Sequence, residues 1–208
     1  MRIKRIKPLL KHVPWVALFL LCSGCSLFKS TPDKTRLFEI GFRPRPLTVS
    51  SSSCSAICIV LNYFPDYLNR PPLMTKISDH ELKSNPCYRW ATPLSENLLH
   101  ILKQSIRQGF PQATVYEFPK DIVAKVDLTL KLDVDTLEID EVSRQVTLSG
   151  VWTFFDGDRV LVDRSDFKFS ESFSSHSNVY SESVAKVEEV ILQLGDAIVE
   201  RTARLLKK

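Results

Sequence analysis

The sequence predicts an α+β fold in which two main helices pack on a mixed, largely antiparallel sheet. Two observations carry this prediction. Three long strands, expected over residues 126–140, 144–155 and 159–173, follow one another and form an antiparallel meander in the C-terminal half. Two segments with apolar residues at helical spacing, one central and one C-terminal, supply the helices. The composition, 44% hydrophobic and 25% charged residues, is that of a globular chain.

The N-terminal segment is expected to be an export signal. A basic stretch from Arg2 to Lys11 precedes an apolar run from Val13 to Cys22, which is shorter than the about 20 apolar residues that a membrane-spanning helix needs. The small residues before Cys25 resemble a bacterial lipobox. Residues 1–24 are therefore predicted to be a lipoprotein signal peptide, and residues 25–35 an acylated cysteine, carrying palmitate, and its tether. The alternative is cleavage near Ser26 by an ordinary signal peptidase.

The charge distribution predicts that lipid, not charge, holds the mature protein to a membrane. Five of the 28 basic residues lie in 1–24, which leaves 23 basic against 24 acidic residues in the rest of the chain. A near-neutral body lacks the basic surface that phosphate contacts require, so nucleic acid is not an expected partner. Several acyl chains on Cys25 would anchor the protein stably. Because Ser26 rather than an acidic residue follows Cys25, the expected location is the outer membrane, facing the periplasm.

Residues 36–208 are expected to form a single periplasmic domain that begins with strands. The elements predicted in its first part are a strand at 37–42, a loop at 43–53, a strand at 56–64, a proline-rich loop at 65–72 and a strand at 73–78. The stretch 56–64 is apolar and rich in β-branched residues, as in a strand buried on both faces. Ser78–Glu81 resembles a small helix-capping box, and Asn85–Pro86 indicates a turn.

The first main helix is predicted to begin at Thr92–Pro93, with Thr92 as its N-cap, and to end at Gly109. A strand at 113–118 follows. Asp156–Asp158 is read as a hairpin turn within the meander, and the second helix is expected at 181–206. The residues predicted to face the core are Leu94, Leu98, Ile101, Leu102, Ser105 and Ile106 in the first helix, and Val184, Val187, Ile191, Leu194, Ile198 and Leu205 in the second.

The sequence lacks the motifs of the common catalytic sites. It contains no nucleophile elbow and no phosphate-binding glycine loop, and the three histidines after residue 24 have no metal-ligand spacing. Asp127, Asp133 and Asp135 could pair as the carboxylates of a hydrolase, but a solvated strand face is the favoured interpretation. The protein is therefore expected not to be an enzyme, and neither a cofactor nor a metal site is predicted. Cys54, Cys58 and Cys87 are read as small buried residues, the alternative being one disulfide and one thiol.

The segment from Asn62 to Trp90 is the candidate binding surface, because it combines aromatic residues and arginines with prolines. Aromatic and arginine side chains supply most of the binding energy at interfaces. The residues predicted to bind a partner are Tyr67, Leu68, Arg70, Arg89 and Trp90. For Trp90 the alternative, that it covers the core beside the first helix, is the favoured one.

Two motifs in this segment make the chain resemble a known family, the ABC-type transport auxiliary lipoproteins. They are Tyr67-Leu68-Asn69-Arg70-Pro71 and Arg89-Trp90-Ala91-Thr92-Pro93-Leu94, which resemble that family's aromatic-Leu-Asn-Arg-Pro segment and its entry into the helix. The lipobox at Cys25, the early strand Leu37–Ile40, the meander and the long C-terminal helix complete the resemblance. The insert Pro86–Tyr88 and the additional cysteines depart from it.

The resemblance implies an auxiliary docking or binding component of an ABC/MCE-type system that moves phospholipid between membranes. Its implied partners are membrane lipid through acylated Cys25, an MCE-domain protein and ABC transporter subunits. A homo-oligomeric ring is a further expectation. The alternative is a structural or envelope-assembly lipoprotein with no role in transport.

Overall fold

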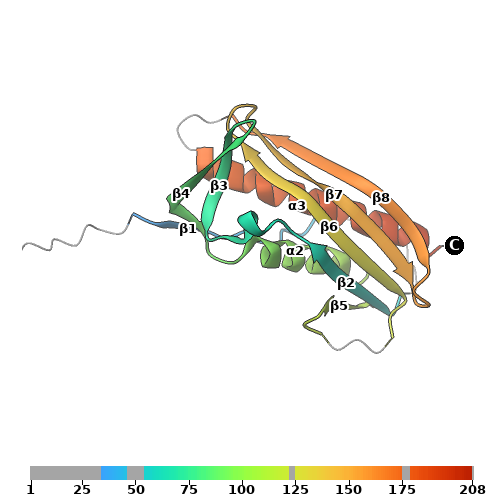
Figure 1. Ribbon diagram of the computed structural model, residues 1–208. Coiled ribbons are helices and arrows are strands. Elements are labelled where there is room, and N and C mark those ends of the chain that lie inside the picture. The colour runs from blue at the N-terminus through green and yellow to red at the C-terminus, as the bar shows by residue number, and fades with distance from the viewer. Residues whose placement is uncertain (1–33, 46–53, 122–124, 175–178, 208) are drawn as a thin grey trace, which may run out of the picture. The chain divides into compact units, whose positions relative to one another are not determined.

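The computed structural model describes residues 34–45, 54–121, 125–174 and 179–207, and Thr35–Lys208 form one compact unit (Figure 1). The predicted signal peptide, Cys25 and nearly all of the tether lie outside the described residues. The strands are β1 (Arg36–Phe38), β2 (Ala56–Tyr63), β3 (Pro72–Ser78), β4 (Glu81–Trp90), β5 (Thr114–Phe118), β6 (Leu128–Asp140), β7 (Gln145–Asp156) and β8 (Leu161–Ser172). The helices are the 3₁₀ turn η2 (Asp66–Asn69), α2 (Leu94–Gly109) and α3 (Val179–Leu205). None of the helices in the described ranges is long and apolar enough to cross a membrane.

Strand β6 organises a mixed sheet of eight strands, counted over the described residues. Along one edge β6 pairs antiparallel with β7, which pairs antiparallel with β8. Along its other edge β6 pairs in parallel with β2, and near its end with β3, where Lys76 lies opposite Asp140. The pair β2–β5 and the group β3–β4–β1 therefore share one edge of β6. The predicted mixed sheet and C-terminal meander are confirmed, and the longest pairings are antiparallel.

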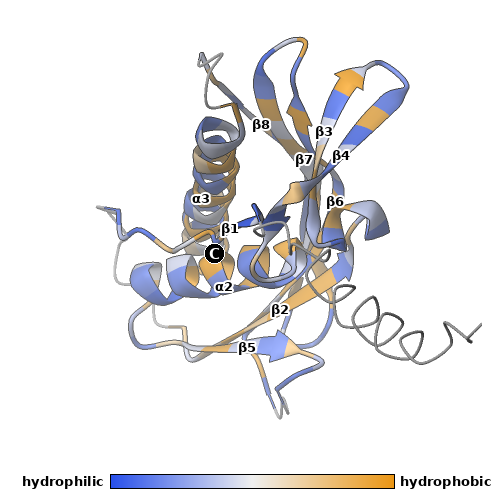
Figure 2. Ribbon diagram, turned by 90° about the vertical axis from the view of Figure 1, so that its left-hand side faces the viewer, coloured by the Kyte–Doolittle hydropathy of each residue, from blue (hydrophilic) through white to orange (hydrophobic). Residues whose placement is uncertain are grey.

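Helices α2 and α3 pack against each other and against one face of the sheet (Figure 2). The alternation in β6 turns Leu128, Leu130 and Leu132 toward them, each at most 3% exposed. The helices approach closely at Gly195 of α3, where a Cβ atom would collide with the side chain of Ser105 on α2. The predicted core residues of both helices are buried, except that Leu205 is only partly buried.

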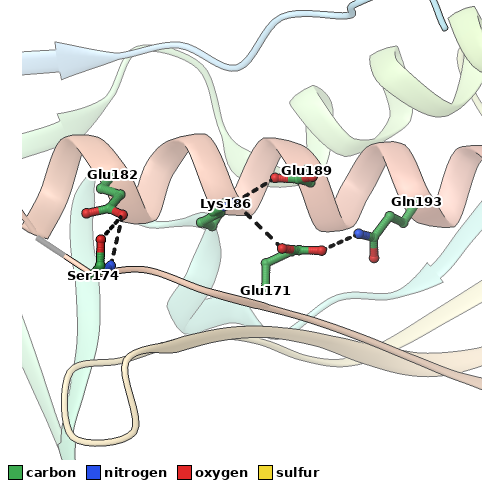
Figure 3. A network of polar contacts seen from close by, with 6 residues as sticks. All are labelled: Glu171, Ser174, Glu182, Lys186, Glu189 and Gln193. Carbon is green, nitrogen blue, oxygen red and sulfur yellow. Dashed lines mark hydrogen bonds and ion pairs between the residues drawn. The ribbon is translucent and has the colours of Figure 1, made fainter.

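Polar contacts fix the end of β8 to α3 (Figure 3). The backbone N–H of Ser174 donates to the Glu182 carboxylate over 2.8 Å. The Glu171 carboxylate on β8 lies between two α3 side chains, accepting from Gln193 and lying 3.6 Å from the Lys186 ammonium. These contacts link strand and helix along their solvent-facing border.

Four local predictions are wrong. Ser78–Glu81 is the tight turn between β3 and β4 and caps no helix. Asn85–Pro86 lies inside β4, because the register with β3 shifts between residues 85 and 89, and such an irregularity tolerates the missing proline N–H. The N-cap position of α2 belongs to Pro93 rather than Thr92. The first strand ends at Phe38, earlier than residue 42.

Candidate functional site

The two sequence motifs that carry the family resemblance meet in space. We call their junction the η2–α2 corner and define it as residues 65–72 and 89–95. The backbone N–H of Trp90 donates to the carbonyl of Pro71 over 2.8 Å. The Asn69 side-chain oxygen accepts a hydrogen bond of 3.1 Å from the backbone N–H of Ser95, in the first turn of α2. The corner therefore ties the loop after β2 to the start of α2.

Two of the predicted binding residues form the interior of this corner. Leu68 and Trp90 are 6% and 7% exposed and belong to the hydrophobic core. They line, with Met74, Leu94, Leu137, Ile139 and Val187, a void of about 10 Å³, which is about the least that holds one water molecule. The alternative stated for Trp90, that it covers the core beside the first helix, describes its position.

The other predicted binding residues lie at the surface of the corner. Arg70 and Arg89 are exposed, and Tyr67 is partly buried. Residues opposite each other in neighbouring strands point to the same face of a sheet. Arg89 of β4 lies opposite Leu37 of β1 on one side and Pro72 of β3 on the other. Leu37 is 67% exposed, so this face of the corner presents an arginine beside an uncovered aliphatic side chain.

Aromatic side chains stack on the opposite face of the same strands. Tyr88 of β4 lies between Phe38 of β1 and Tyr180 of α3, with ring centroids 5.9 and 4.2 Å away. The Arg36 guanidinium lies 6.0 Å from the centre of the Tyr88 ring, within reach of a cation–π contact. This stack joins three segments that are remote in sequence, and the sequence pattern around each of them did not reveal it.

Tyr67 is the ionisable residue of the corner whose pKa departs from its usual value. Burial raises the pKa of Tyr67, with smaller contributions from Glu138 and Tyr63, so this phenol stays protonated. Within the described residues, no group of three His, Cys, Asp or Glu side chains could hold a metal ion. The described side chains of the corner therefore form no group of His, Cys, Asp or Glu that could hold a metal ion.

The acidic residues singled out from the sequence serve the backbone. One Asp127 carboxylate oxygen accepts hydrogen bonds from the backbone N–H groups of Ser55, over 2.6 Å, and Ala56, over 3.0 Å. These bonds fix the start of β2 and hold the pKa of Asp127 below its usual value. Asp133 accepts a hydrogen bond from the Asn62 side chain. Asp127 and Asp133 are therefore structural acceptors rather than members of a simple solvated face.

The three cysteines in the described ranges are free thiols. Cys54 and Cys58 are buried, as expected from the sequence, whereas Cys87 is exposed. The alternative of one disulfide among them is not realised. Cys87 lies in the irregular part of β4, beside Pro86. The prediction that it is buried is therefore wrong.

Comparison with known proteins identifies the family. Residues 45–199 match the family described as the ABC-type transport auxiliary lipoprotein component. The chain belongs to this family. The match spans most of the described residues and includes both motifs of the η2–α2 corner, so the resemblance drawn from those motifs is confirmed. Membership places the protein among transport auxiliary lipoproteins, which are not a class of enzymes and which belong to the cell envelope.

Two solved structures of other proteins have a fold similar to that of this chain. The protein XCC0632 from Xanthomonas campestris is 15% identical, with a TM-score of 0.70, over 82% of this chain and 96% of its own. A second structure, that of an uncharacterized protein, is 17% identical with a TM-score of 0.65 and covers 81% of this chain and 98% of its own. At these identities the likeness concerns the fold. No curated protein matches the sequence.

Proposed function

We propose that this protein is the membrane-anchored docking component of an ABC/MCE-type system that transports phospholipid between membranes. In this proposal acylated Cys25 holds the protein to the outer membrane, and the domain faces the periplasm. An MCE-domain protein, connected to ABC transporter subunits, binds to the domain, and copies of the domain associate in a ring. Membership of the transport auxiliary family supports the transport role.

The observation that carries the docking role is the division of the η2–α2 corner into an inner and an outer part. Leu68 and Trp90 are buried in the core and Asn69 is bonded to α2, so the corner is held in one geometry. Arg70 and Arg89 remain exposed on it, with Leu37 beside Arg89. Arginine is among the residues that interface hot spots favour, and a rigid support holds such side chains in place for a partner.

Site-specific cross-linking in intact cells tests this proposal. A photoreactive amino acid replaces Arg89 or Arg70 in the full-length protein, and the matched control replaces Lys168, an exposed residue of β8. We expect Arg89 and Arg70, but not Lys168, to cross-link to an MCE-domain protein. If all three positions capture the same proteins, or if the corner positions capture no transporter component, the docking role is wrong.

The anchor needs a separate test, since Cys25 lies outside the described residues. Cells expressing the wild type or the Cys25→Ser variant are grown with radiolabelled palmitate. We expect label on the wild-type protein and none on the variant, because Cys25 is the proposed acylated residue. A variant that still carries label would show that the lipobox assignment is wrong.

The second hypothesis, an envelope-assembly lipoprotein with no transport role, is separated by the same cross-links. It predicts that the corner captures envelope-assembly or structural proteins and that deletion of the protein leaves phospholipid exchange between the membranes unchanged. Family membership favours the transport proposal over this one.

A further inference from the structure

A row of side chains crosses the sheet on the face opposite to α2 and α3. In β2 and β6, Ile57 and Leu130 are fully buried on the helix side. Their neighbours Cys58 and Thr129 are paired with each other and therefore point to the other face. The register continues this row outward in both directions, and its members are Tyr116, Cys58, Thr129, Phe155 and Leu161, from β5 to β8.

Residues of this face line a cavity of about 660 Å³. The strands that contribute to it, β5, β2, β6 and β7, lie side by side in the sheet (Figure 1). Its wall includes Val60 next to Cys58 in β2, Phe118 at the end of β5 and Phe155 in β7. Phe118 is 55% exposed. Cavities of about 300–1,000 Å³ with apolar walls are typical of small-molecule sites.

Two carboxylates, Asp121 and Asp156, and two cations line this cavity, and the carboxylates have partners within the protein. Asp121 accepts hydrogen bonds from the Lys103 ammonium, over 3.2 Å, and from the backbone N–H of Glu117, over 2.7 Å. Asp156 is engaged in the β7–β8 turn, where it accepts from the backbone N–H groups of Asp158 and Val160, over 3.0 and 2.8 Å. Both carboxylates are therefore occupied by partners within the protein.

The two cations at the rim, Lys125 and Arg159, are exposed and form no salt bridge with the described part of the chain, although Lys125 lies near enough to the Asp127 carboxylate to help lower its pKa. Arg159 also has a φ of 64°, in the left-handed region that glycine and asparagine adopt more readily than a long side chain does. A long cationic side chain thus stands in a turn position where glycine or asparagine would be less strained. Arg159 is one of the residues that line the cavity.

We propose that this cavity binds one acyl chain of an anionic amphiphile. The chain lies against Val60, Phe118 and Phe155, and the anionic head group contacts Lys125 and Arg159 at the rim. Apolar side chains with two exposed cations at their edge match a molecule with an apolar chain and a negative end. This binding site is distinct from the η2–α2 corner and does not rest on the docking proposal.

Photolabelling of the full-length protein in phosphatidylcholine vesicles tests this inference. Three probes carry the same photoreactive C16 chain: the fatty acid, a phosphatidylglycerol and the uncharged fatty alcohol. Labelled peptides are identified by mass spectrometry. We expect the fatty acid, the phosphatidylglycerol or both to label the peptides that contain Val60, Phe118 or Phe155, about tenfold more than the alcohol does. The comparison of the two anionic probes shows whether a free fatty acid or a phospholipid supplies the chain.

Variants of the rim and of the wall make the result specific. Lys125→Gln with Arg159→Asn removes both cations and suits the left-handed turn, so labelling by the anionic probes should fall to the level of the alcohol. The matched control, Lys83→Gln with Lys168→Gln, removes two exposed cations elsewhere and should label as the wild type does. Val60→Trp fills the cavity and should reduce labelling by every probe, with circular dichroism confirming that each variant is folded.

Two results would overturn the inference. One is equal labelling of the cavity peptides by the alcohol and by the anionic probes. The other is undiminished labelling of the rim variant in its folded form. Neither result bears on the docking role, because no transporter component is present in the vesicles.

Discussion

Asn69 caps a helix that begins 25 residues later in the chain: its side-chain oxygen accepts the backbone N–H of Ser95, in the first turn of α2, over 3.1 Å. No side chain at the N-cap position itself does so, because that position is held by Pro93. The loop after β2 is thus part of the helix start. Asn69 and Ser95 also join the two motifs by which the family is recognised, which gives those motifs a structural reason.

Replacing Asn69 by alanine should therefore destabilise the protein. The change leaves the Ser95 N–H without its acceptor, and the loss of such a cap lowers the free energy of unfolding by about 0.5–2 kcal/mol. Asn69→Asp keeps an acceptor oxygen and places a negative charge at the helix N-terminus, so it should be close to the wild type or more stable. Urea unfolding followed by circular dichroism measures both. Equal stability of the alanine and aspartate variants would contradict the capping role.

Gly195→Ala should also be destabilising, for a reason of packing. A Cβ at this position of α3 collides with the Ser105 side chain of α2, and overpacking of this kind lowers the free energy of unfolding by about 1–3 kcal/mol. Ser105→Gly removes the obstructing side chain. In a double-mutant cycle by urea unfolding, the Gly195→Ala substitution should therefore be less destabilising in the Ser105→Gly background than in the wild type. If the effects of the two substitutions on the free energy of unfolding are additive, the Ser105 side chain is not the cause of the destabilisation by Gly195→Ala.

The thiols should differ sharply in reactivity. Burial, with the Asp127 carboxylate nearby, raises the pKa of Cys54 to about 11, and burial also raises the pKa of Cys58. Because the thiolate is the nucleophile, iodoacetamide at pH 8 should modify exposed Cys87 and leave both buried thiols intact until urea unfolds the protein. Peptide mass spectrometry after timed alkylation distinguishes the three. Comparable rates for Cys58 and Cys87 in the folded protein would contradict this prediction.

The elements that the sequence predicted well are those specified by neighbours along the chain. The period-two alternation from Leu128 to Val134 is enough to predict this part of β6 as a strand. A local stop signal is enough to predict that α2 ends at Gly109. The predicted strand and the predicted helix end are both confirmed. An element that buries one face has the same period of apolar residues in any fold of this class.

The features that escaped prediction depend on contacts between remote segments. The cap from Asn69 to Ser95 replaced the expected local cap by Thr92. Pro86 signals a turn locally, yet the shift of register against β3 accommodates it within β4. The exposed members of the candidate surface could be named by residue type, but only the packing of Leu68 and Trp90 showed which members support the corner from inside.

Asp127 should make the stability of the protein depend on pH in the acid range. Hydrogen bonds from the backbone N–H groups of Ser55 and Ala56 lower the pKa of this carboxyl in the folded state, relative to about 3.9 in the unfolded chain. Its stabilising effect is therefore complete above the unfolded-state pKa and is lost as the pH falls through the lower, folded-state pKa. Asp127→Asn should reduce the free energy of unfolding at pH 7, and the difference from the wild type should shrink progressively below pH 4.

Urea unfolding at a series of pH values from 7 to 2 measures this difference, and the matched control is Asp135→Asn. Asp135 is an exposed residue further along β6, so its replacement removes one carboxylate without removing the bonds to Ser55 and Ala56. The control should follow the pH profile of the wild type. If Asp127→Asn and Asp135→Asn give the same profile, the acid sensitivity reflects net charge rather than the bonds that hold the start of β2.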